Sequence, residues 1–77
     1  MVVRFTKSAR NHRIGRRHAL HVIDNPTAVL AGLTSPEGQE LFMYLGTDET
    51  GRPLEVGLIL EGDDIVVIHV MPMRKRW

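Results

Sequence analysis

Residues 54–71 read LEVGLILEGDDIVVIHVM, and this stretch decides the fold that we expect for the chain. Every second residue of its first half is leucine or valine, and these share one face of a strand: Leu54, Val56, Leu58 and Leu60. Residues 65–71 are apolar on both sides except for His69, which is typical of a central strand. Residues 61–64 have the composition of a tight turn. The stretch therefore predicts a β-hairpin.

The preceding part of the chain predicts two more strands, over residues 27–33 and 40–47. Polar, glycine-containing turns at residues 35–38 and 48–51 separate these strands from each other and from the hairpin. Strict alternation in residues 40–47 places Phe42 and Tyr44 on one face of the sheet. We expect this to be the outer face, the one that also carries Glu55.

The N-terminal part predicts a short strand over residues 2–5 and then two short helices, over residues 7–11 and 16–23. Thr6 offers an N-cap for the first helix, and Ile14-Gly15 reads as the break between the two, because glycine accepts a positive φ. Both helices should cover the Leu54 face. The expected fold class is α+β, in the order β-α-α-β-β-β-β, with the helices on one face of a four- to five-stranded, mostly antiparallel sheet. A chain of 77 residues has room for one core, so residues 1–77 are expected to form a single domain.

The charges of the chain are strongly segregated. All nine acidic residues lie between Asp24 and Asp64, where Arg52 is the one basic residue, so this middle part carries −8. The other nine basic residues give the two ends +9: Arg4, Lys7, Arg10, Arg13, Arg16, Arg17, Arg74, Lys75 and Arg76. A chain of this kind can present a basic face to phosphates, although the same charges can also lie scattered on a solvated surface.

Three absences restrict the class of protein. The chain has no cysteine, so a disulfide framework and a thiolate metal site are excluded. Its first residues contain no long apolar segment of the kind found in signal peptides. Residues 65–73, the longest apolar stretch, are too few to span a bilayer. We therefore expect a cytoplasmic protein that does not bind membranes.

The histidines are the first candidates for chemistry. His18 and His21 are three residues apart on the second helix, but no Cys/His or HExxH pattern supplies further ligands. We expect these two on a solvated helix surface, with no metal and no cofactor. His69 interrupts an apolar strand, so it is either a hydrogen-bonded core histidine or part of a functional face.

Metal-free cleavage of RNA needs a base for the 2′-hydroxyl, a cation for the phosphate and an acid for the leaving 5′-oxygen. Side chains of the required types are present in the chain at His12, Glu55, His69 and Arg74. Nothing in their spacing shows that they converge.

An ordered set of short segments carries a resemblance to a known family. These are Asn11-His12-Arg13-Ile14-Gly15, then Asp24-Asn25-Pro26, Gly46-Thr47-Asp48, Gly51 to Val56 and Val67 to Arg74. Together they extend over nearly the whole chain and resemble the RelE/ParE superfamily of bacterial toxins, closest to its BrnT-like branch.

The resemblance implies a RelE-like fold and a ribosome-dependent or free mRNA endonuclease, the toxin of a type II toxin–antitoxin system. It also implies a cognate antitoxin, often with a ribbon-helix-helix domain. The positions that match are His12, Arg52, Glu55, His69 and Arg74. With them we assign His12, Glu55, His69 and Arg74 as catalytic. The residues expected to contact nucleic acid are Lys7, Arg10, Arg13, Arg16, Arg17, Arg52, Lys75 and Arg76.

Two other functions stay open. One is a non-catalytic module, either a gyrase-directed toxin or a degenerate relative that only binds its partner. The other is a small nucleic-acid-binding protein, although the four aromatic residues Phe5, Phe42, Tyr44 and Trp77 are few for a base-stacking platform.

Overall fold

The computed structural model describes residues 1–73, which form five strands, one α-helix and one 3₁₀ turn. The strands are β1 (Val3–Phe5), β2 (Ala28–Thr34), β3 (Glu40–Thr47), β4 (Pro53–Glu61) and β5 (Asp64–Pro72). The helical segments are the 3₁₀ turn η1 (Ser8–Arg10) and the α-helix α1 (Arg16–Asp24). Every expected strand is confirmed, with its ends within one residue of the expected ones.

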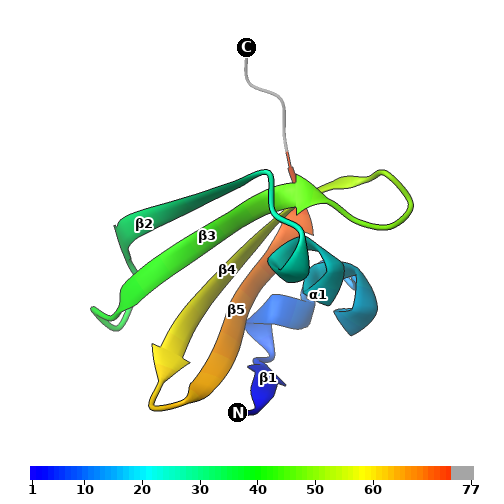
Figure 1. Ribbon diagram of the computed structural model, residues 1–77. Coiled ribbons are helices and arrows are strands. Elements are labelled where there is room, and N and C mark those ends of the chain that lie inside the picture. Colours follow the sequence, from blue (N-terminus) through cyan, green and yellow to red (C-terminus); the bar gives the residue numbers. More distant parts are fainter. Residues whose placement is uncertain (74–77) are drawn as a thin grey trace.

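All five strands belong to one mixed sheet, in the spatial order β1-β5-β4-β3-β2 (Figure 1). The four long strands are antiparallel to their neighbours, whereas β1 runs parallel to β5. Helix α1 lies across one face and packs on β3 and β4. The α+β class is therefore confirmed, and the sheet has the larger of the two expected sizes.

The main core lies between α1 and the sheet. Val22 from α1 and Leu54 and Val56 from β4 have no exposed surface, and Leu58 is 2% exposed. The expected inner face of β4 is thus confirmed for Leu54, Val56 and Leu58. It is wrong for Leu60, which is 55% exposed, because β4 continues beyond the area that α1 covers.

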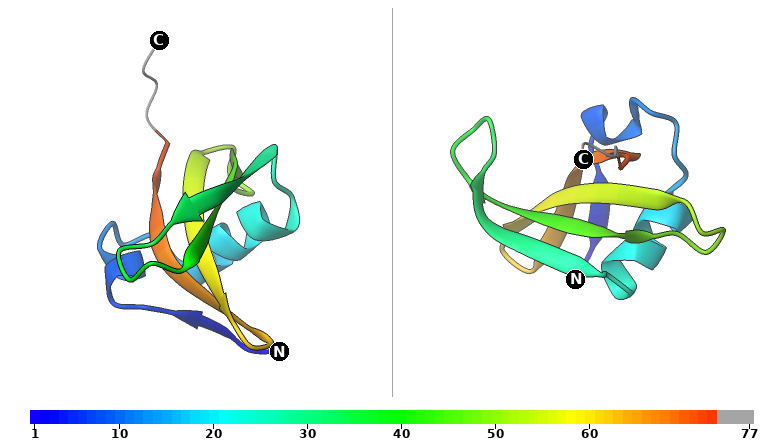
Figure 2. Two further views of the ribbon diagram at one scale, coloured as in Figure 1. Left: turned by 90° about the vertical axis from the view of Figure 1, so that its left-hand side faces the viewer. Right: turned by 90° about the horizontal axis from the view of Figure 1, so that it is seen from above.

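Two short helices on one face were expected, and this is wrong for the first of them. Residues 8–10 form a 3₁₀ turn, and Figure 2 shows η1 and α1 on opposite sides of β5. After the end of β1, the chain stays beside β5. The Thr6 N–H donates to the carbonyl of Val67, and Ser8 Oγ donates to the carbonyl of Ile68. These bonds to the neighbouring strand compete with α-helical bonds and hold the segment at the sheet.

The break between η1 and α1 is confirmed, but its geometry differs from the expectation. Arg13 takes the positive φ, at 56°, whereas Gly15 has a φ of −65° and is the N-cap of α1. The Arg13 N–H donates a hydrogen bond to the carbonyl of Arg10. The left-handed conformation therefore falls two residues before the glycine.

Phe42 and Tyr44 were expected on the outer face of the sheet, and this is wrong. Phe42 pairs with Leu58 and Tyr44 pairs with Val56, so both aromatic rings lie on the α1 side and pack against the core. Alternation separates the two faces of a strand but does not say which one is buried. The pairing with β4 decides it.

A β-bulge in β5 determines the position of His69. Leu58 pairs with Val67 and the preceding Gly57 pairs with His69, so Ile68 is an extra residue on the β5 side. Val67 faces the core, and uninterrupted alternation would turn His69 toward the core as well. The extra residue reverses the phase and places His69 on the outer face, opposite α1.

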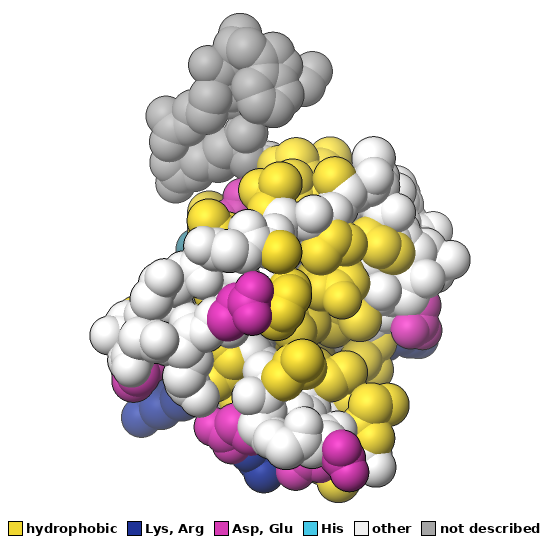
Figure 3. All heavy atoms as spheres, turned by 60° about the vertical axis from the view of Figure 1, so that its left-hand side comes forward, with side chains coloured by type: hydrophobic (Ala, Val, Ile, Leu, Met, Phe, Trp, Pro, Cys, Tyr) yellow, Lys and Arg dark blue, Asp and Glu magenta, His cyan; other side chains and the backbone are white. Residues whose placement is uncertain are grey.

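Strand β2 is an exposed edge of the sheet. All seven of its residues are exposed, and none of them is charged. Figure 3 shows hydrophobic side chains gathered on this side of the molecule with acidic side chains at the margin; Val29, Leu30 and Leu33 are among the exposed hydrophobic residues. Among residues 1–73, no helix has the length and apolar character needed to cross a bilayer.

Candidate functional site

Glu55 and His69 form a hydrogen-bonded pair on the outer face of the sheet. His69 Nε2 lies 2.9 Å from Glu55 Oε1, and the two side chains are 35% and 27% exposed. Glu55 comes from β4 and His69 from the bulged part of β5, two strands that are neighbours in the sheet. The histidine is therefore both hydrogen-bonded and accessible, which combines the two interpretations that the sequence left open.

His69 also lies at the wall of a groove of about 630 Å³ on this face. The floor of the groove is apolar and comes from three strands, with Leu41, Met43, Ile59, Val66 and Ile68 among its residues. The walls come from Thr6 and Ser8 on one side and from the β2–β3 turn on the other. A ligand in the groove would thus contact His69 beside an apolar surface.

Two hydroxyl groups at the groove support the bulge. Ser8 Oγ donates to the carbonyl of Ile68, the extra residue of β5, and Thr6 Oγ1 lies 3.1 Å from Ser8 Oγ. Because a bulged residue loses a regular partner in the ladder, the serine supplies the missing hydrogen bond. The N-terminal segment therefore helps to hold His69 in its orientation.

Among residues 1–73, the structure does not bring His12 to this pair. His12 is exposed in the turn after η1 and is not part of the groove wall. Arg74 lies outside the described residues, as do Lys75 and Arg76. Of the expected catalytic set, the described structure unites Glu55 and His69.

The described basic residues that were expected to contact nucleic acid divide into two groups, according to whether another side chain of the protein contacts their charged group. Arg16 lies 4.7 Å from the centre of the Phe5 ring, Arg17 pairs with Glu49 at 3.2 Å and Arg52 pairs with Asp48 at 3.2 Å. The second group is Lys7, Arg10 and Arg13, which are exposed, and no carboxylate of residues 1–73 pairs with them. These three residues belong to the segment that forms one wall of the groove.

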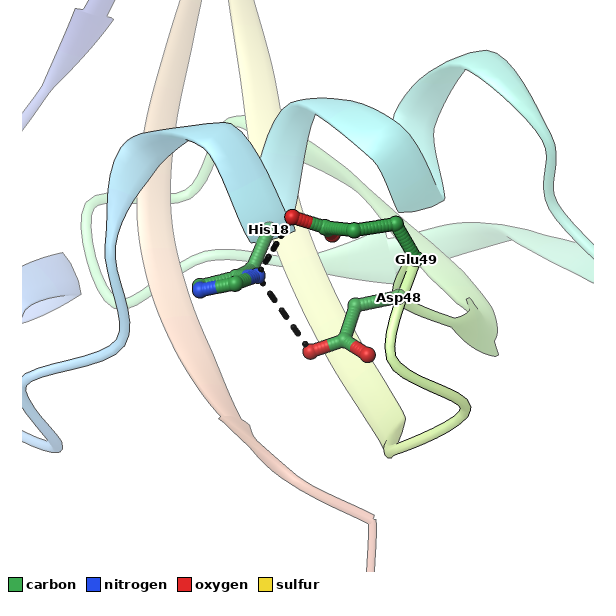
Figure 4. Close-up of side chains that lie close together, drawn as sticks. All are labelled: His18, Asp48 and Glu49. Carbon is green, nitrogen blue, oxygen red and sulfur yellow. Dashed lines mark ion pairs between the residues drawn. The ribbon is translucent and has the colours of Figure 1, made fainter.

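A second cluster, on the α1 side of the sheet, contains His18, Asp48 and Glu49 (Figure 4). His18 Nδ1 lies 2.9 Å from Glu49 Oε2 and 3.5 Å from Asp48 Oδ2. The expectation that His18 lies on a solvated helix surface is wrong, because its side chain is only 22% exposed. Nothing in the sequence links residues 48 and 49 to the helix, so the cluster could be found only from the packing of α1 on the β3–β4 loop.

Asp48 organises the β3–β4 loop. Its fully buried carboxylate accepts hydrogen bonds from Thr50 N and Oγ1 and from Arg52 N and Nε. These bonds, first of all the one from the Thr50 hydroxyl, hold the pKa of Asp48 far below its usual range. The pKa of Glu49 is also lowered, mainly by its own backbone N–H and then by the His18 ring. Both carboxylates are therefore charged at neutral pH.

Comparison with known proteins gives no relative of this chain. No family model, no curated protein and no solved structure matches it. The functional assignment thus depends on the residues themselves.

Proposed function

We propose that this protein is a metal-independent endoribonuclease that cleaves mRNA, acting as the toxin of a type II toxin–antitoxin system. The observation that carries the proposal is the Glu55–His69 pair, a carboxylate in hydrogen-bond contact with an imidazole that lies at the wall of an accessible groove. A pair of this kind is a common way to hold a histidine ready as a general base.

The carboxylate has a defined role in this proposal. When His69 donates its Nε2 proton to Glu55, the other ring nitrogen is left without a proton and can accept one. That nitrogen removes the proton of a ribose 2′-hydroxyl, whose oxygen then attacks the neighbouring phosphorus. The bond from phosphorus to the 5′-oxygen breaks and the 5′-oxygen takes a proton from a water molecule, which in turn receives the proton held on His69. The products are a 2′,3′-cyclic phosphate and a 5′-hydroxyl.

RNA would reach the pair along the basic N-terminal segment. Lys7 stands between Thr6 and Ser8, which both line the groove, and Arg10 and Arg13 follow it. Because none of these three cations is paired with a carboxylate of residues 1–73, they are available to phosphates. Arg74, carried over from the family resemblance, is proposed for the scissile phosphate.

The family resemblance extends the proposal to the fold type and the partner. One helix on a mixed five-stranded sheet is compatible with a small RelE-like fold, although the expected second helix is a 3₁₀ turn. A cognate antitoxin, of the ribbon-helix-helix type in many such systems, is proposed to bind the toxin in the bacterial cytoplasm.

A second candidate function is a module that binds a partner without catalysis, such as a gyrase-directed toxin. The observation in its favour is the apolar floor of the groove, which includes Leu41, Met43 and Ile68. Such a floor suits the side chains of a protein segment better than a phosphate backbone.

One culture experiment separates the two functions. The wild-type protein and His69→Ala are expressed from an inducible promoter, while growth and RNA 5′ ends are followed in the same culture. We expect growth arrest with new 5′-hydroxyl mRNA ends for the wild type, and loss of both for His69→Ala at equal soluble expression. Arrest without new ends would reject the nuclease and favour the binding module. Lys7→Gln serves as a matched variant that weakens cleavage without removing the base.

A further inference from the structure

The cluster of His18, Asp48 and Glu49 has no role in the proposed nuclease, because it lies on the α1 side of the sheet. We propose that it is a binding site for one divalent transition-metal ion, with Zn²⁺ the best match. The ion would connect α1, through His18, to the β3–β4 loop, through the two carboxylates.

The spacing of the three ligand atoms fits a metal. His18 Nδ1 is 2.9 Å from Glu49 Oε2 and 3.5 Å from Asp48 Oδ2, and all three ligand atoms lie within 4.8 Å of one another. Zinc bonds to nitrogen and oxygen of about 2.0–2.2 Å place neighbouring ligand atoms roughly 3–3.5 Å apart. A single ion can thus contact all three after small movements of the side chains.

His18 supplies a second, independent observation. Its Nδ1 is buried, and no group of residues 1–73 is aligned to hydrogen-bond it, although Glu49 Oε2 is only 2.9 Å away. The distance is right for a hydrogen bond but the direction is wrong. A buried ring nitrogen that lies beside two carboxylates without a hydrogen bond to either is arranged as in a metal site, and Figure 4 shows this nitrogen on the side of the ring that faces both carboxylates.

Asp48 is prepared for this role by its surroundings. Oδ1 accepts the three hydrogen bonds from Thr50 and from Arg52 N, while Oδ2 accepts only the one from Arg52 Nε. Oδ2 therefore keeps free coordination capacity on the side of His18. Hydrogen-bonded partners behind a ligating carboxylate are usual in metal sites and fix its orientation.

Two arginines compete with the ion to different degrees. Arg52 Nε donates to Asp48 Oδ2, the proposed ligand atom, at 3.2 Å, and this oxygen has a second lone pair for the ion, so Arg52 can stay in place as its hydrogen-bond partner. Arg17 contacts Glu49 Oε2, the proposed ligand atom, at 3.2 Å. Its side chain is 84% exposed, so this ion pair is weak and a divalent ion can displace it.

The donor set selects the class of metal. One imidazole nitrogen and two carboxylate oxygens match Zn²⁺ and its neighbours Co²⁺ and Mn²⁺, whereas Ca²⁺ and Mg²⁺ prefer oxygen ligands alone. The two carboxylates neutralise the charge of a divalent ion. A metal that links helix and loop also suits a chain this short, because small domains gain stability from such links.

The test is a titration of the untagged, full-length protein with Co²⁺, followed by visible absorption, and competition by Zn²⁺. We expect one Co²⁺ per chain with the absorption bands of a four- or five-coordinate site, displacement by one equivalent of Zn²⁺, and a rise in Tm with Zn²⁺. Glu49→Gln and His18→Gln should each weaken binding by about tenfold or more. His21→Ala on the same helix and His69→Ala in the groove should leave it unchanged.

The proposal is overturned if Co²⁺ does not bind below about 1 mM, or if Glu49→Gln and His18→Gln bind it as the wild type does. It is also overturned if His69→Ala abolishes binding, since the metal would then belong to the groove. A third contrary result is a Tm that falls in His18→Gln but never responds to Zn²⁺. That result would make the cluster a plain ion pair between imidazolium and carboxylates. Circular dichroism of each variant establishes that it is folded.

Discussion

At the scale of single residues, Glu55 is the clearest test of the proposed chemistry. Glu55→Gln replaces a carboxylate, which accepts the His69 proton, by an amide of the same shape that can also donate. Because the histidine tautomer is then no longer fixed, we expect cleavage to fall by about 10²-fold or more. Initial rates on a fluorescent RNA would measure this loss, and circular dichroism establishes that the variant is folded.

A purely structural role for Glu55 would give a different result. In that case Glu55→Gln would lower the free energy of unfolding and the rate together, and the rate per folded molecule would stay near that of the wild type. Glu37→Gln, a change of the same type at another wall of the groove, is the matched control and should retain most of the rate.

The two ends of β4 offer a second comparison at this scale. Leu54 is fully buried and Leu60 is 55% exposed, although both are leucines on the same face of the same strand. We expect Leu54→Ala to lower the free energy of unfolding by about 2–5 kcal/mol, the usual cost of a cavity in a core. Leu60→Ala should stay within about 0.5 kcal/mol of the wild type. Urea denaturation measures both, and equal losses would contradict the position of the core.

At the scale of elements, the bulge in β5 connects the fold to the site. The sequence predicts the strand and marks His69 as unusual, but one extra residue decides which face the histidine takes. A bulge depends on how two strands pair, and no local sequence pattern around Ile68 predicts one. The sequence therefore named both Glu55 and His69 as candidates without being able to place them together.

Gly57 lies opposite His69 in the neighbouring strand and leaves it room. A Cβ at position 57 would come 3.2 Å from His69 Cβ and 3.4 Å from Leu41 Cδ1. We expect Gly57→Ala to displace the ring and reduce cleavage by about 10²-fold, the usual effect of misplacing a catalytic group by an ångström. The cost in stability should be about 1–3 kcal/mol. The NMR signals of the His69 ring would report the displacement, and initial rates would report the loss of cleavage.

Gly15→Ala is the control for this change. The Cβ at position 15 would meet its nearest neighbour, His18 Cδ2, at an ordinary distance of 3.5 Å, and it lies away from the groove. Cleavage by Gly15→Ala should be normal. If both alanine variants cleave RNA at the wild-type rate, the placement of His69 is not what limits the reaction.

The errors of prediction at this scale have a common cause. The predictions were wrong for the buried face of β3, for the length of the first helical segment and for the environment of His18. Each of these features depends on a contact with a distant part of the chain. Phe42 is buried because β3 pairs with β4, and His18 is shielded because α1 packs beside Glu49. The strands themselves were predicted well, because their alternation and turns are local signals.

At the scale of the whole molecule, the segregated charges bear on the binding of RNA. Much of the expected basic surface is neutralised within the fold, since Arg4 pairs with Glu61 and Arg17 with Glu49. Lys7, Arg10 and Arg13 are the described Lys and Arg residues with neither a carboxylate partner nor a ring contact among residues 1–73, since Arg16 lies over the Phe5 ring. The charge pattern of the sequence thus overstates the surface that can bind phosphate.

The salt dependence of RNA binding should follow this division. Removing all three free cations, as Lys7→Gln, Arg10→Gln and Arg13→Gln together, should lower the slope of log K against log salt by about 2, since each phosphate contact to a single strand contributes about 0.7. Arg17→Gln removes one charge that is already paired and should change the slope little. Fluorescence anisotropy of a labelled RNA between about 50 and 200 mM salt gives both values. Equal slopes for the triple variant and the wild type would place the phosphate contacts elsewhere.

The parallel pairing of β1 with β5 has a consequence during protein synthesis. Val3 lies beside Ile65 in the sheet, so a nascent chain carries its first strand unpaired until about sixty further residues have left the ribosome. The same delay applies to the segment with Thr6 and Ser8, which supports the carbonyl of Ile68, and to His69 itself. The Glu55–His69 pair therefore cannot assemble until His69 has left the ribosome, so a shorter nascent chain would lack the site of the proposed reaction.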